Sequence, residues 1–174
     1  MYARSLVMLR RPALSLSLLL LTLPALPTAA ASTSPVLDQE QSVFNGALSI
    51  RGGASQTVTV GVAGLLVRVD LVLCAPIKNA DVQVTVTNSG ANAGSATTSL
   101  RFRQSYADCA WYTFAFGQPI KANVGDVIIL SVKTQNHKAA LWGRDGRAID
   151  SYPRGVGTWR RHAINDFAFR TYMQ

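Results

Sequence analysis

The sequence predicts an all-β fold, built as an antiparallel sandwich or a barrel of seven to nine short strands. Apolar residues alternate with polar ones in one segment after another, which is the pattern of strands that bury one face. Clusters of Gly, Asn, Asp and Ser separate these segments at the short intervals that are typical of turns. Beyond the first thirty or so residues, no segment keeps a helical period.

The clearest predicted strand is residues 81–87, where valines alternate with polar side chains. Residues 126–133 are more continuously apolar, which predicts a central strand covered on both faces. The alternating period also runs through residues 57–62, 67–71, 99–103, 113–116 and 167–170. Turns are expected at residues 51–53, 88–90, 123–126 and 143–146.

The N-terminal segment has the three regions of a secretory signal peptide. Arginines without any acid precede a leucine-rich run at residues 13–26, and small residues follow at 27–31. A membrane anchor is the alternative, but the run is shorter than the roughly 18–20 residues that span a bilayer, and it contains Pro24. We therefore predict cleavage after Ala31, a secreted or periplasmic location, and one mature domain at residues 32–174 without a transmembrane segment.

The charge balance narrows the classes of partner. The chain carries a net charge of +8, which includes three arginines in the predicted signal peptide. A positive balance outside the cytoplasm points to anionic envelope polymers or lipids as partners. Nucleic acid is not expected, because the sequence contains no lysine-rich run and no base-reading motif.

The sequence contains two cysteines, Cys74 and Cys109. An even number of cysteines in an exported protein predicts a disulfide, and both lie at the ends of strand-like runs. Unlinked buried thiols or a metal site are the alternatives, although two cysteines without nearby histidines make a poor metal site. We expect no cofactor and no metal, and the segment at Asn165 and Asp166, where a structural calcium ion is conceivable, lacks the spacing of a calcium loop.

Several motifs occur in order along the predicted mature chain. They lie at residues 37–41, 56–64, 69–71, 119–126, 141–143 and 166–172. In this order they resemble a group of small exported bacterial β-sandwich modules that are similar to carbohydrate-binding modules, and the closing motif is the most specific part. The resemblance implies a jelly-roll-like sandwich that binds or displays rather than catalyses, and it supplies no catalytic residues. Between Trp142 and Asp166 such modules tend to be rich in Gly, Ser and Asn, whereas arginines dominate here, which argues against a neutral sugar.

The segment at residues 142–164 is the candidate binding site, because it combines aromatic and arginine side chains with few acids. Sugar rings stack on the faces of Trp and Tyr, and guanidinium groups bind carboxylate or phosphate in a bidentate manner. The segment therefore predicts an acidic glycan or a phosphorylated envelope polymer as the ligand. The alternative is that the tryptophans close the end of the sandwich while the arginines are solvated. The predicted ligand-contacting residues are Trp142, Arg144, Tyr152, Trp159, Arg160 and Arg161.

Catalysis is not predicted. His137 and His162 are the two histidines, and a serine–His162–Asp166 arrangement lacks the Gly-x-Ser-x-Gly motif that would support it. Motifs for a zinc protease, a phosphate loop or a dinucleotide site are also absent from the sequence. The leading prediction is a non-catalytic binding module. The alternative is a structural or adhesive building block of the cell envelope, whose protein partner would pair with an edge strand.

Overall fold

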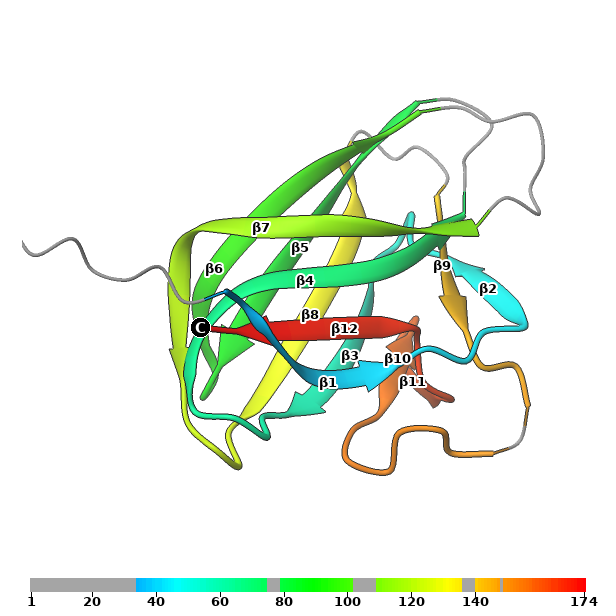
Figure 1. Ribbon diagram of the computed structural model, residues 1–174. Helices are drawn as coiled ribbons and strands as arrows, with labels where there is room; N and C mark the ends of the chain where they lie inside the picture. The colour runs from blue at the N-terminus through cyan, green and yellow to red at the C-terminus, as the bar shows by residue number, and fades with distance from the viewer. Residues whose placement is uncertain (1–33, 75–78, 102–108, 136–139, 148) are drawn as a thin grey trace, which may run out of the picture. The chain divides into compact units, whose positions relative to one another are not determined.

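In the part of the chain that the computed structural model describes, twelve β-strands form two antiparallel sheets and no helix is present (Figure 1). The structure describes residues 34–74, 79–101, 109–135, 140–147 and 149–174. The predicted signal peptide and its cleavage site lie outside these residues. All described residues belong to one folded unit, Thr33–Gln174.

The strands follow the chain in order. They are β1 (Val36–Gln41), β2 (Gly46–Ser49), β3 (Ala54–Thr59), β4 (Gly64–Cys74), β5 (Ala80–Asn88), β6 (Ala91–Leu100), β7 (Cys109–Ala122), β8 (Val127–Thr134), β9 (Leu141–Arg144), β10 (Gly157–Trp159), β11 (His162–Ile164) and β12 (Phe169–Met173).

The pairing of the strands is that of a jelly roll. In the first sheet, β4 pairs with β7 along one edge. Along its other edge β4 pairs first with β12 and, nearer its C-terminal end, with β9. β1 pairs with the outer edge of β12, and β2 pairs with β9. The second sheet has the order β11-β10-β3-β8-β5-β6. Without the short strands β2, β9, β10 and β11, eight strands remain, and they form two four-stranded sheets of order β1-β12-β4-β7 and β3-β8-β5-β6, as in two Greek keys. The predicted antiparallel β-sandwich is therefore confirmed.

The core lies between the two sheets because each long strand turns alternate side chains inward. The valines of β5 at positions 82, 84 and 86 are fully buried, while the polar residues between them face outward. β8 is a central strand, as predicted, but it is covered on one face only. Ile128, Leu130 and Val132 are buried, whereas Val127 is 52% exposed, because nothing packs on the outer face of a two-layer sandwich.

Cys74 and Cys109 form a disulfide, as predicted. They are directly opposite each other in the pairing of β4 with β7, so the bond joins two neighbouring strands at their ends. Disulfides of this kind persist in oxidising compartments. Among the described residues, no helical segment has the length and hydrophobicity that a membrane span requires.

Candidate functional site

The predicted binding segment consists of three structural parts. β9 carries Trp142 and Arg144 in the first sheet. A connection at residues 145–156 follows, which we name the Asp145 loop. The hairpin of β10 and β11 then adds to the free edge of β3 in the second sheet. The segment thus contributes to both sheets, and its parts have different chemistry.

Two of the predicted ligand-contacting rings belong to the core. Trp142 has no exposed surface, stacks on Phe167 with ring centroids 4.1 Å apart, and donates from Nε1 to the Ala168 carbonyl at 2.9 Å. Tyr152 is 5% exposed, and its ring meets Phe169 edge to face. Its hydroxyl lies within hydrogen-bond distance of the Gln39 side chain and the Thr59 carbonyl. The prediction that these two rings contact a ligand is therefore corrected. They close the end of the sandwich, where a large aromatic group contributes most by being buried.

Trp159 is the last residue of β10, and its half-buried side chain packs against the core. Its Nε1 donates to the Ser49 carbonyl at 2.8 Å, which fixes the ring against β2. The Arg160 guanidinium lies over the ring, 4.3 Å from its centroid. Trp159 therefore supports Arg160 by a cation–π contact rather than offering that side of its ring to a sugar.

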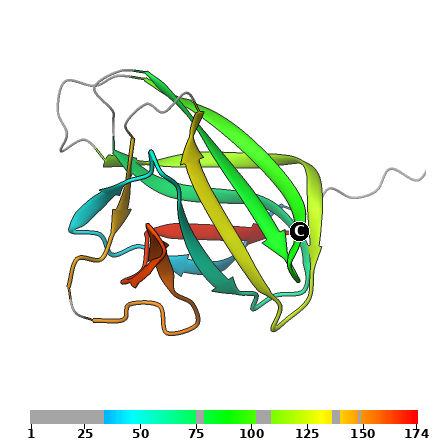
Figure 2. The same cartoon turned by 180° about the vertical axis from the view of Figure 1, so that it is seen from behind.

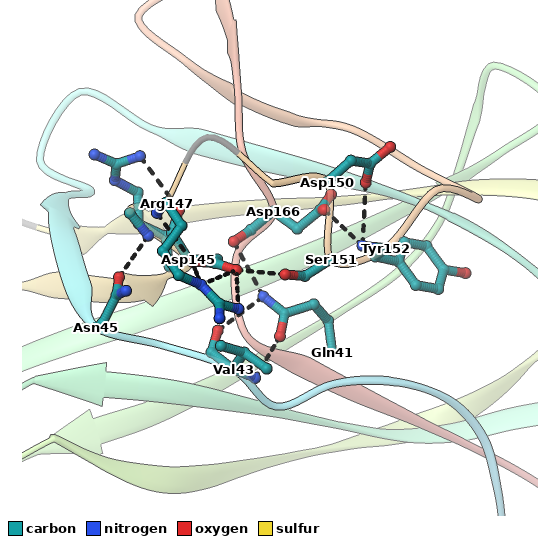
Figure 3. A network of polar contacts seen from close by, with 11 residues as sticks. Gln41, Val43, Asn45, Asp145, Arg147, Asp150, Ser151, Tyr152 and Asp166 are labelled. Carbon is teal, nitrogen blue, oxygen red and sulfur yellow. Dashed lines mark hydrogen bonds and ion pairs between the residues drawn. The ribbon is translucent and has the colours of Figure 1, made fainter.

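Asp145 organises the start of the loop that bears its name (Figure 3). Its buried carboxylate accepts three hydrogen bonds from the Arg147 guanidinium, at 2.8, 2.9 and 3.2 Å. It also accepts from the Arg147 backbone N–H and the Ser151 hydroxyl. The Arg147 side chain, followed by Ser151, holds the pKa of Asp145 well below its ordinary value. Arg144 points back to the same loop and donates to the Asp145 carbonyl at 3.4 Å. Arg144 and Arg147 therefore stabilise the Asp145 loop.

Asp166 holds the middle of the Asp145 loop at Tyr152. Its buried carboxylate accepts from Gln56 Nε2 and from the Tyr152 backbone N–H, both at 2.9 Å, while its carbonyl accepts from Gln41 Nε2 at 3.2 Å. Asp150 accepts from the same Tyr152 N–H at 3.1 Å, which brings two carboxylates together. Burial raises the pKa of Asp166, and the neighbouring Asp150 adds to the shift. Both oxygens of Asp166 are thus used in holding the chain.

Arg160 and Arg161 lie at the tip of the β10–β11 hairpin, and they line a groove of about 680 Å³ on the outer face of the second sheet. An adjoining hollow of about 560 Å³ shares Gly52, Gly53 and Lys133 with it. In Figure 2 this sheet faces the viewer, with β8 in yellow between β3 in teal and β5 in green. We name the two hollows together the sheet groove.

Hydroxyl side chains form the floor of the sheet groove. Strand pairing puts Thr158 of β10 opposite Ser55 of β3, Ser55 opposite Ser131 of β8, and Ser131 opposite Thr85 of β5. All four residues line the groove. Because paired residues on one face of a sheet have their Cβ atoms about 4.5–5.5 Å apart, the hydroxyls form a continuous row across four strands.

Positive charge surrounds this floor. The four cations that line the groove are Arg51, Lys133, Arg160 and Arg161. All four are exposed, and in the described part of the chain none has a carboxylate partner, since the ion pairs there use Arg68, Arg147 and Arg170. The sheet groove is therefore a polar surface whose charge is not neutralised by the protein.

The turn at residues 51–53 lines the groove, with Gly52 and Gly53 shared by both hollows. Gly53 has a φ of +85°, a conformation that favours glycine. A Cβ added at Gly52 would meet no atom within 4 Å, so a side chain there would enter free space. The sequence predicted this turn correctly, but not that it lies beside β8 and the hairpin.

Of the six predicted site residues, the structure thus brings only Arg160 and Arg161 to the groove. His162 is exposed on β11, and no hydrogen bond joins it to a serine or to Asp166 in the described residues. Comparisons with protein-family models, with characterised proteins and with solved structures found no match to this chain. The site is therefore interpreted from its own chemistry.

Proposed function

We propose that the protein is an exported, non-catalytic module that binds an anionic glycan or another anionic envelope polymer in the sheet groove. The observation that carries the proposal is the set of four unneutralised cations around a floor of hydroxyl groups. Guanidinium groups form short, bidentate hydrogen bonds with carboxylate, phosphate or sulfate. Serine and threonine hydroxyls can donate to the same anions or exchange hydrogen bonds with sugar hydroxyls.

Charge, rather than ring stacking, provides the binding energy in this proposal. Trp142 and Tyr152 are buried, and Trp159 has Arg160 over its ring. Interactions between exposed charges are screened by salt, with a Debye length of about 10 Å at 0.1 M and about 3 Å at 1 M. Binding is therefore expected to weaken strongly as the salt concentration rises.

Export is part of the proposal and has two supports. One is the order of charged, apolar and small residues in the predicted signal peptide. The other is the disulfide between Cys74 and Cys109, which suits an oxidising compartment. The resemblance to exported β-sandwich modules is in keeping with both.

The test is calorimetric titration of the protein with polygalacturonate, dextran sulfate and neutral dextran at low and high salt. We expect binding to the two anionic polymers at low salt only, and none to dextran. The double variant Arg160→Gln/Arg161→Gln should weaken binding at least tenfold, because a hydrogen bond to a charged group contributes about 1.5–3 kcal/mol. Arg154→Gln is the matched control, since Arg154 is exposed but bonded to Gln39 outside the groove.

A steric variant tests the same groove without changing its charge. Gly52→Leu adds a side chain in open space at the groove, and should weaken polymer binding while leaving the thermal unfolding curve nearly unchanged. Equal binding of dextran and the anionic polymers would contradict the proposal. So would an Arg154→Gln variant that loses as much affinity as the double variant.

A second candidate function is that of a structural building block that pairs with a protein through β1. β1 is the outermost strand of the first sheet, and its residues Val36 and Leu37 are 53% and 48% exposed. Exposed edge strands are sites of strand addition. Association that increases with protein concentration in light scattering, together with no polymer binding, would favour this candidate.

A further inference from the structure

We propose that the ligand of the sheet groove is an extended acidic polysaccharide that runs across the strands of the second sheet, from β10 over β3 and β8 to β5. The inference rests on the proposed function and adds to it the class of polymer and its direction. Its basis is the presence of two parallel rows of side chains with different chemistry along the groove.

The first row is the line of hydroxyls from Thr158 through Ser55 and Ser131 to Thr85. The second row lies two positions further along each strand, on the same face of the sheet. Between the two rows, strand pairing aligns Trp159 with Ala54, Ala54 with Val132, and Val132 with Val84. The residues that follow these in the same direction form the second row, which is Arg160, Gly53, Lys133 and Gln83. The second row thus carries two cations and an amide beside a glycine, and Arg161 and Arg51 flank it at the groove margin.

A polymer that satisfies both rows has anionic groups and hydroxyl groups on each unit. A polyuronate has this composition, because every sugar ring carries a carboxylate and free hydroxyls. Inorganic polyphosphate offers anionic oxygens but no hydroxyls for the first row. The three strand spacings from β10 to β5 amount to about 14 Å, at about 4.8 Å each, so the chain would place about one sugar ring on each strand.

The test is the affinity of the protein for oligogalacturonates from dimer to octamer, measured by calorimetry at low salt. We expect affinity to rise with length and to level off at about four units, one for each strand crossed. Thr85→Val should weaken binding of the longer oligomers roughly threefold to tenfold through loss of a hydrogen bond, and leave the dimer unaffected. Thr87→Val is the matched control, because Thr87 is on the same face of β5 but outside the groove.

The outcomes separate this inference from the proposed function. If the double arginine variant weakens binding but affinity does not depend on length, the groove binds anions and the crossing chain is wrong. If Thr85→Val and Thr87→Val have equal effects, the proposed direction is wrong. If polyphosphate of equal charge binds as tightly as the octamer, the polysaccharide class is wrong. If neither oligomer nor polymer binds, both proposals fail.

Discussion

Asp145 shows how one residue decides which arginines are available for binding. Its carboxylate accepts three hydrogen bonds from the Arg147 guanidinium, and its backbone carbonyl accepts one from Arg144. Arg160 and Arg161, in the same segment of the sequence, have no acidic partner in the described residues. In the sequence these four arginines look alike, because the two aspartates among them, Asp145 and Asp150, do not indicate which arginine each one binds.

Replacement of Asp145 tests this role through the pH dependence of stability. A carboxyl group whose pKa is lowered by folding stabilises the protein above its ordinary pKa of 3.8, and this stabilisation is lost as the pH falls through the lowered value. Asp145→Asn should therefore have a smaller free energy of unfolding than the unchanged protein at neutral pH. The difference between the two should shrink as the pH falls below about 4, as measured by urea unfolding at a series of pH values.

Asp166 contributes with the opposite sign to the same curves. Its pKa is raised in the folded state, so its contribution to stability declines as the pH rises above its ordinary value of 3.8. It remains present in the Asp145→Asn variant and cancels in the comparison. Asp81→Asn controls for the loss of one acid outside the loop, since Asp81 bonds Ser99 on β6. A stability difference between Asp145→Asn and the unchanged protein that is constant with pH would contradict the assigned role.

At the scale of elements, the β10–β11 hairpin carries the most informative backbone. Trp159 pairs with His162, so Arg160 and Arg161 are the two residues of the connection, and their φ values are +48° and +69°. Positive φ at both positions is the pattern of a type I′ turn, which favours Asn-Gly. Arginine is a poor choice for folding at both positions. Residues in such strained conformations cluster at functional sites, which supports the proposed role of these two arginines.

Exchange of the turn therefore separates folding from binding. Arg160→Asn/Arg161→Gly should raise the free energy of unfolding by about 1–2 kcal/mol, because glycine at position 161 removes the roughly 1–2 kcal/mol that a left-handed L-residue costs, and asparagine adopts this conformation more readily than arginine. The lost contact of Arg160 with Trp159 offsets about 0.5–1 kcal/mol of this. The same variant should lose at least tenfold in polygalacturonate affinity. A variant that is more stable and binds as well as before would show that these arginines have no part in binding.

Strand length determined which elements could be predicted. β5 and β8 have long apolar patterns and were expected close to their observed positions. β9 lies partly where a turn was expected, because Gly143 and Arg144 are turn-like locally but pair with Ala47 and Gly46 of β2. The three-residue strands β10 and β11 are too short for a period to be recognised. Their formation depends on the tertiary contact with β3.

At the scale of the whole folded unit, the jelly-roll pairing creates the sheet groove. The turn at residues 51–53, the middle of β5, the end of β8 and the β10–β11 hairpin are far apart in the sequence, but they meet on one face of the second sheet. Alternation in the sequence predicted which residues face outward in β5. It could not predict which strands are neighbours, and so Ser55, Ser131 and Lys133 gave no signal of a site.

The burial of Trp142 also depends on tertiary structure that the local sequence does not indicate. An arginine-rich segment with two tryptophans suggests a binding surface, and the sequence left open whether these rings bind a ligand or close the sandwich. The stacking of Trp142 on Phe167 decides between these alternatives for that residue. The contact depends on the crossing of the chain near Ala168, which bonds both Gly143 and Val72. This crossing is a tertiary feature that no local pattern indicates.

The measurement that tests the central claim most directly is a map of backbone amide chemical shifts in the ¹⁵N-labelled protein as polygalacturonate is added at low salt. The account predicts that the largest shifts cluster at residues 51–55, 83–85, 131–133 and 158–161, and that they disappear at high salt. Shifts concentrated on β1 and β12 or on the Asp145 loop would contradict it, as would a spectrum that does not change.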